Sequence, residues 1–187
     1  MGFMKKEIIE IIDCTIKTIW EYDIKRDYNE RWLLKEDTLK NTFYYYLRTK
    51  LDGLFREYNI RVFTEFTDSV FAGAGLRPDI VIAEMNFKKS SKYYGDDVKE
   101  LLCVMELKYK NGFSSSKDIA KDYDKLQKYV KDLNVDCKLY MATIWEYEDD
   151  ETSWVRKNAA WAKGRLTELN ASYERETGDM RFYIYQH

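Results

Sequence analysis

The sequence contains one histidine, three cysteines and one proline among 187 residues, and each shortage excludes a kind of site. Because the only histidine is the terminal His187, a Ser-His-Asp triad, a Cys-His pair and histidine-ligated zinc are excluded. Cys14, Cys103 and Cys137 are odd in number and have no CxxC spacing. We therefore expect buried free thiols in a reducing compartment, not a disulfide framework or a zinc knot.

The chain also lacks an apolar run of about 18 residues, so the sequence predicts no membrane-spanning segment and no membrane partner. Glu7, Glu10 and Asp13 interrupt the pattern of a secretion signal, and we therefore expect a cytoplasmic protein. The formal net charge of −2 gives no overall attraction to nucleic acid, so such binding would need local basic patches. The length of 187 residues predicts a single domain, residues 1–187, with a sizeable core.

Apolar periodicity divides the chain into four helices and five strands. Helical spacing predicts helices, with a connector at residues 23–28, over residues 3–22, 33–57, 117–132 and 153–170. Alternating or continuous apolar runs predict strands over residues 60–71, 79–85, 101–110, 138–145 and 180–185. This order favours an α/β sandwich with a mixed sheet. The apolar stripe of the first helix would either cover the core or form the surface of a homodimer.

The strand predicted at residues 101–110 begins as an apolar run and ends in charged residues. Because side chains alternate along a strand, Glu106 and Lys108 project from the same face. The preceding strand begins at Asp79, directly after Pro78. If the two strands are neighbours, two carboxylates and a lysine converge, and such charges are costly to bury unless they are paired or bind something. This convergence predicts a metal-and-water site.

The chemistry of a phosphodiesterase suits these residues. Hydrolysis of a phosphodiester needs a nucleophilic water and neutralisation of charge on the phosphoryl oxygens. Carboxylates are ligands for Mg²⁺, which keeps several waters, and a metal-bound water is a usable nucleophile. Asp79 and Glu106, with the carbonyl of Leu107, are therefore predicted to hold Mg²⁺, for which Mn²⁺ would substitute. Lys108 would orient the water or stabilise the transition state, and neighbouring carboxylates disfavour a role for it as a base.

The sequence Pro78-Asp79, followed by Glu106-Leu107-Lys108, resembles the motif of the PD-(D/E)XK nuclease superfamily, and the resemblance covers about residues 33–146. It implies an α/β, restriction-endonuclease-like fold: an αβββαβ core with a mixed central sheet flanked by helices. An extra N-terminal helix and a C-terminal helix–strand extension would lie outside this core. The resemblance also implies a magnesium-dependent endonuclease.

Glu36 lies on the inward stripe of the helix predicted at residues 33–57. By the resemblance, Glu36 would be the helix-borne acid of the family, a third metal ligand or a holder of the water. An acid favoured by the helix dipole explains Glu36 equally well. Glu65 is a weaker candidate for the same role. A purely structural interpretation of Asp79, Glu106 and Lys108 is a cluster of salt bridges at the end of the strand.

Four lysines lie on one face of the helix predicted at residues 117–132, where they would either follow a phosphate backbone or form a solvated face. They are Lys117, Lys121, Lys125 and Lys128. Gln127 and Tyr123 lie on the same helix, which in the family often directs a polar residue toward the metal. The acidic run at residues 146–151 would repel a duplex, so a DNA path should avoid it.

The leading hypothesis is a Mg²⁺-dependent nuclease that hydrolyses phosphodiester bonds of DNA by a metal-activated water. One alternative is a catalytically silent module on the same fold, a phage- or defence-associated protein that binds nucleic acid or a protein. Another is a nuclease specific for RNA or for a cyclic nucleotide.

Overall fold

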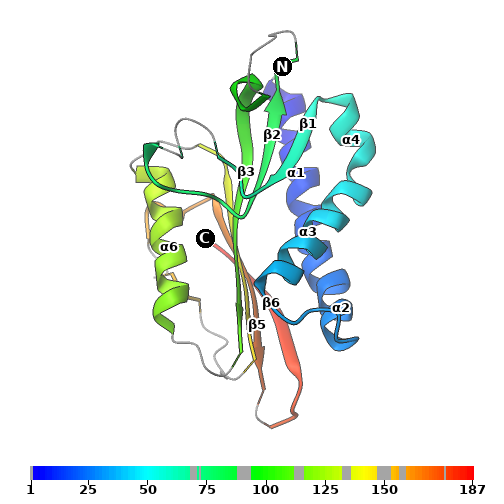
Figure 1. Cartoon of the computed structure of the whole chain (residues 1–187), viewed down its shortest axis with the longest axis vertical. Helices are drawn as coiled ribbons and strands as arrows, with labels where there is room; N and C mark the ends of the chain where they lie inside the picture. Colours follow the sequence, from blue (N-terminus) through cyan, green and yellow to red (C-terminus); the bar gives the residue numbers. More distant parts are fainter. Residues whose placement is uncertain are drawn as a thin grey trace.

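The structure is a computed structural model that describes residues 2–67, 71, 73–87, 94–111, 116–131, 136–146, 153–155, 159–174 and 176–187. It is an α/β fold in which a six-stranded mixed sheet stands between two layers of helices (Figure 1). Helices α1 to α4 cover one face of the sheet and α6 covers the other. Within the described part of the chain, no helix is long and apolar enough to cross a membrane.

The strands lie in the sheet in the order in which they occur in the chain. They are β1 (Ile60–Thr64), β2 (Ile80–Met85), β3 (Val98–Lys110), β4 (Lys138–Trp145), β5 (Leu166–Tyr173) and β6 (Met180–Gln186). Strands β3, β4 and β5 are parallel, and the other neighbours are antiparallel. A parallel pair needs a crossover connection, and α6 supplies the one between β3 and β4.

The helical layer on the first face of the sheet is formed by the N-terminal part of the chain, residues 2–57. The described helices and helical turns include α1 (Gly2–Thr18), the π-helical η1 (Ile19–Ile24), α2 (Lys25–Asn29), α3 (Glu36–Lys50), α4 (Asp52–Glu57), the 3₁₀ turn η2 (Tyr94–Asp97) and α6 (Ser116–Lys131). The apolar stripe of α1 covers the core of its own chain, because Ile8, Ile12 and Ile16 are buried there.

Alternate residues of β3 pack into the two halves of the core. Met105 and Leu107 pack with Phe43 on the side of α1 to α4, whereas Val104 packs with Leu126 on the side of α6. Because side chains alternate along a strand, Glu106 lies on the same side of the sheet as Val104, under α6.

Most elements predicted from periodicity are confirmed. The strands expected at residues 79–85, 101–110 and 180–185 are β2, β3 and β6, and β4 covers residues 138–145 as expected. The helix expected at residues 117–132 is α6. The connector expected at residues 23–28 is instead helical, because the first helix continues through η1 into α2.

Two predicted elements have different bounds in the structure. The helix expected at residues 33–57 is two helices, α3 and α4, divided at Leu51. The strand expected at residues 60–71 ends at Thr64, because Glu65 has a left-handed backbone conformation with φ of 51°. Residues 68–70 of that prediction lie outside the described part of the chain.

The helix predicted at residues 153–170 is wrong over the described residues. Residues 160–165 form turns, and β5 begins at Leu166. Leu166 faces the α6 half of the core and Leu169 the other half, so their spacing serves a strand buried on both faces. The C-terminal extension is therefore a pair of strands, not a helix and a strand.

Substitution of Phe43 tests the packing that holds α3 on the sheet. It is fully buried, and its ring stacks on Trp20 with the ring centroids 6.0 Å apart. Phe43→Ala is expected to lower the free energy of unfolding by about 3–5 kcal/mol, because it removes apolar contacts and leaves a cavity. Urea denaturation followed by circular dichroism measures the change.

Tyr45→Ala is the matched control on the same helix, since Tyr45 is 59% exposed. Its free energy of unfolding should change by about 0.5 kcal/mol or less. Equal losses in the two variants would contradict this account of the core.

Candidate functional site

Asp79 and Glu106 are neighbours at the point where the antiparallel ladder of β2 and β3 ends. Ile80 pairs with Met105 in the antiparallel ladder of β2 and β3, so Asp79, one residue earlier, lies opposite Glu106. The backbone N–H of Leu107 donates a hydrogen bond of 2.8 Å to Oδ2 of Asp79. This bond fixes the Asp79 carboxylate against β3, next to the face that carries Glu106.

The carboxylate of Glu106 is fully buried under α6. The hydroxyl of Tyr129 donates a hydrogen bond to Oε1 of Glu106, and Nζ of Lys125 lies 3.4 Å from Oε2. Burial, together with the negative charge of Asp79, raises the pKa of Glu106 to about 8, although Lys125 and Tyr129 act in the opposite direction. The positive charge near Glu106 is therefore too small to offset its burial beside another acid.

Lys108 is held between acids from two helices. Its Nζ lies 3.0 Å from Oε2 of Glu36 at the start of α3, and 2.9 Å from Oδ2 of Asp122 on α6. Burial lowers the pKa of Lys108, but these two carboxylates raise it more, so its pKa lies above the ordinary value. Lys108 is therefore an ammonium at neutral pH, able to orient water or an anion but not to accept a proton.

Lys40 is a site residue that sequence reasoning missed. Its Nζ lies 3.6 Å from Oδ1 of Asp79 and also pairs with Glu65. Glu65 pairs in addition with Nε of Arg77 at 2.6 Å. Lys40 follows Glu36 by four residues. Because residues at positions i and i+4 share a helix face, this spacing could have indicated from the sequence that Lys40 lies near the site.

Helix α6 directs Lys125 and Tyr129 at Glu106, whereas the residues expected to do so have other partners. The hydroxyl of Tyr123 donates to Glu168 at 3.0 Å, and Gln127 lies against Trp161. Lys125 also lies 2.7 Å from Oδ1 of Asp122. The lysine expected on a phosphate-binding stripe is thus part of the site.

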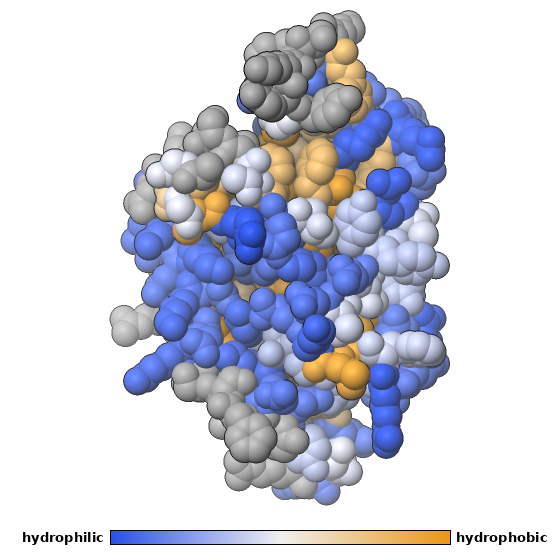
Figure 2. All heavy atoms as spheres, in the orientation of Figure 1, coloured by the Kyte–Doolittle hydropathy of each residue, from blue (hydrophilic) through white to orange (hydrophobic). Residues whose placement is uncertain are grey.

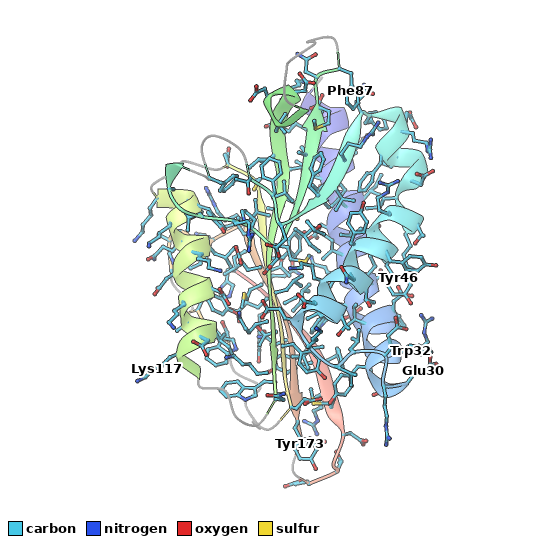
Figure 3. All side chains as sticks on the ribbon, in the orientation of Figure 1. Glu30, Trp32, Tyr46, Phe87, Lys117 and Tyr173 are labelled. Carbon is cyan, nitrogen blue, oxygen red and sulfur yellow. The ribbon has the colours of Figure 1, made fainter. Side chains whose placement is uncertain are left out.

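The other three lysines of that stripe, Lys117, Lys121 and Lys128, are exposed. Lys117 points outward from the first turn of α6 (Figure 3). Hydrophilic side chains gather over α6 and the middle of this face of the molecule (Figure 2). Of the acidic run at residues 146–151, Glu146 is described and accepts a hydrogen bond of 2.7 Å from the hydroxyl of Tyr109. Residues 147–151 lie outside the described part of the chain.

A second buried acid, Glu168, lies on the same face of the sheet, because Met141 pairs with Glu106 on one side and with Glu168 on the other. The donors to its carboxylate are side chains and backbone N–H groups of Tyr123, Ser153, Trp154, Val155 and Asn170, with His187 also in contact. Its hydrogen-bonding capacity is filled, which is what a structural acid requires. Glu168 was not predicted from the sequence, because residues 153–170 were expected to form a helix.

The acids of the site form a pair, not a larger cluster. Among the described residues, no three histidine, cysteine, aspartate or glutamate side chains are grouped so that they could hold a metal ion. Mg²⁺ is commonly bound by one or two carboxylates with waters completing its shell, so Asp79 and Glu106 fit it by their chemistry. The shortage of positive charge at Glu106 agrees with this fit. The carboxylate of Glu36 lies on Lys108 here, so the metal-binding roles of Glu36 and of the Leu107 carbonyl stay predictions.

The raised pKa of Glu106 gives a pH dependence of stability. Between the ordinary carboxyl pKa and about 8, the folded protein holds a proton on Glu106 that the unfolded chain has lost. The free energy of unfolding is therefore expected to fall as pH rises from 5 to 8, by at most about 1.4 kcal/mol per pH unit from this group. Urea denaturation at several pH values measures the slope.

Glu106→Gln lacks this titration, so its stability should fall less over the same range. Glu21→Gln, at an exposed position of η1, should follow the wild-type profile and serves as the control. A profile of Glu106→Gln that matches the wild type would show that another group sets the dependence.

Searches of protein-family models, curated proteins and solved structures gave no significant match to this chain. Its activity must therefore be inferred from its own residues. Those residues are Asp79 and Glu106, with Lys40 of α3 at Asp79 and Lys125 of α6 at Glu106. Lys108, on the same face of β3 as Glu106, is held by Glu36 and Asp122.

Proposed function

We propose that the protein is a magnesium-dependent nuclease that hydrolyses phosphodiester bonds of DNA on a PD-(D/E)XK, restriction-endonuclease-like core. The observation that carries the proposal is the placement of Asp79 against β3, opposite Glu106, with Lys108 on the same face as Glu106. An acid pair next to a fixed ammonium is what metal-assisted phosphodiester hydrolysis requires.

The arrangement of the elements supports this proposal. Helix α3, strands β1 to β3, helix α6 and strand β4 follow one another in the order αβββαβ, with β3 and β4 parallel. The resemblance implies a core with this order of elements, and the additional short helix α4 lies between α3 and β1. The N-terminal helix α1 and the strands β5 and β6 would be additions to it.

Each residue has a role that follows from its contacts. Asp79 and Glu106 would hold the ion, which when bound supplies an acidic water and neutralises phosphoryl charge. Lys108, kept protonated by Glu36 and Asp122, would orient the water or bear charge that develops on the phosphoryl oxygens. Lys125 would hold the carboxylate of Glu106 in place from α6.

The exposed lysines of α6 support a nucleic acid as the substrate. Lys117, Lys121 and Lys128 stand on the helix that carries Lys125 into the site, so a backbone lying along α6 would reach Asp79 and Glu106. Contacts of this kind bind phosphates without reading the sequence. The surface does not separate DNA from RNA, so the assay must include both.

A silent module on the same fold is the second candidate, and one observation favours it. Asp79, Glu106, Glu36 and Asp122 each face an ammonium within the chain. A set of buried ion pairs of this kind can have a purely structural role. Such a module would bind nucleic acid or protein without cleavage.

A cleavage assay with matched variants tests the proposal. Plasmid, linear and single-stranded DNA, RNA and a cyclic oligonucleotide are incubated with the protein and Mg²⁺ or Mn²⁺. Asp79→Asn and Lys108→Met are expected to reduce the cleavage rate by on the order of 100-fold or more, since the first removes a ligand of the metal ion and the second removes a positive charge beside the reacting phosphate.

Glu84→Gln is the control, because Glu84 is an ion-paired acid of β2 whose partner, Lys99, lies 2.6 Å away outside the site. It should cleave as the wild type does. Absence of cleavage of every substrate by folded wild-type protein would favour the silent module. Unchanged cleavage by Asp79→Asn would place the chemistry elsewhere.

A further inference from the structure

Lys40 reaches the acid pair from α3 and occupies one side of Asp79. Oδ2 of Asp79 is taken by the Leu107 N–H, whereas Oδ1 faces Nζ of Lys40 at 3.6 Å. The Lys40 side chain is only 11% exposed, so its ammonium depends on this carboxylate and on Glu65 for the interactions that water would otherwise supply. The Asp79 oxygen that has no backbone partner is thus the one that holds Lys40.

Glu65 is fixed beside Asp79 at a cost in backbone conformation. Its φ of 51° lies in the left-handed region, which a residue with a side chain seldom adopts. The backbone N–H of Glu65 donates to the carbonyl of Asp79 at 2.9 Å, which holds the two residues together. The carboxylate of Glu65, also bound by Arg77, is therefore a second acceptor for Lys40 that persists if Asp79 takes another partner.

A divalent cation and Lys40 cannot both lie on Oδ1 of Asp79. Two positive groups that share one carboxylate oxygen repel each other strongly in a partly buried site. We propose that Lys40 is the counter-ion of Asp79 in the metal-free protein, and that it exchanges Asp79 for a phosphate oxygen of the substrate when a divalent cation binds. This inference rests on the proposed function and adds to it a substrate-binding residue and a link between two ligands.

The phosphate is the chemically suitable new partner for Lys40. When Asp79 is taken, the ammonium keeps one carboxylate, Glu65, and has three N–H groups to donate. Its excess positive charge then lies at the place where a phosphodiester would approach Asp79. Because linkage is reciprocal, the substrate and the cation each strengthen the binding of the other through Lys40.

Metal affinity is the measurement that separates this role from a structural one. Mn²⁺ is titrated into wild-type protein, Lys40→Met and Lys40→Arg, and free Mn²⁺ is followed by electron paramagnetic resonance without nucleic acid. Lys40→Met should bind Mn²⁺ about fivefold or more tightly, because the competing charge is gone, whereas Lys40→Arg should stay near the wild type. DNA binding, measured by fluorescence anisotropy with Ca²⁺ in place of Mg²⁺, should weaken by a similar factor in Lys40→Met.

Lys50→Met is the control for a change of charge on the same helix, since Lys50 pairs with Asp23 at 3.0 Å, ten residues from Lys40. It should leave Mn²⁺ affinity unchanged. If Lys40→Met does not fold, Lys40→Gln, which keeps a polar side chain without the charge, replaces it. Mn²⁺ affinity in folded Lys40→Met that is equal to or weaker than that of the wild type overturns the inference alone. Absence of Mn²⁺ binding by the wild type overturns the proposed function, and the inference with it.

Discussion

The burial of the Glu106 carboxylate beside Asp79 is the constraint on which the arrangement of the site depends. The ionised form of Glu106, without solvent and beside a second acid, is unfavourable unless positive groups reach it. The fold meets part of this need with Lys40 of α3 at Asp79 and Lys125 of α6 at Glu106, and the pKa of Glu106 stays raised to about 8. Helices α3 and α6, on opposite faces of the sheet, are thus both joined by ion pairs to the Asp79 and Glu106 pair.

The same network explains why the acid pair suits a ligand. Removing one partner of a buried ion pair leaves an uncompensated charge, so an exchange of partners is less costly than a loss. Asp79 can exchange Lys40 for another cation while Lys40 keeps Glu65. Lys108 has no such freedom, because Glu36 and Asp122 hold it from two helices. The site therefore combines one exchangeable ammonium with one fixed ammonium.

Local sequence patterns predicted that Glu106 and Lys108 share a face of β3, but not which residues surround them. The period of two places Glu106 and Lys108 on one face, and apolar runs give β2, β3 and β4, because these depend on few residues. The spacing of Leu166 and Leu169 suits a helix and a doubly buried strand alike, and only the neighbours β4 and β6 decide for the strand. The left-handed turn at Glu65, which sets the partners of Lys40, depends on a hydrogen bond to Asp79 and so could not be predicted from local sequence.

The N-terminal helices contribute no acid to the pair, yet they determine how α3 presents its charged residues. Leu39, Phe43 and Leu47 form the buried stripe of α3, and Phe43 stacks on Trp20 of η1. Glu36 and Lys40 each precede a stripe residue by three positions, so the packing of the stripe also fixes the direction of both charged side chains. A shift of α3 by one residue would turn each of them by about 100° and break their contacts with Lys108 and Asp79. The helices outside the proposed core are therefore part of what assembles the site.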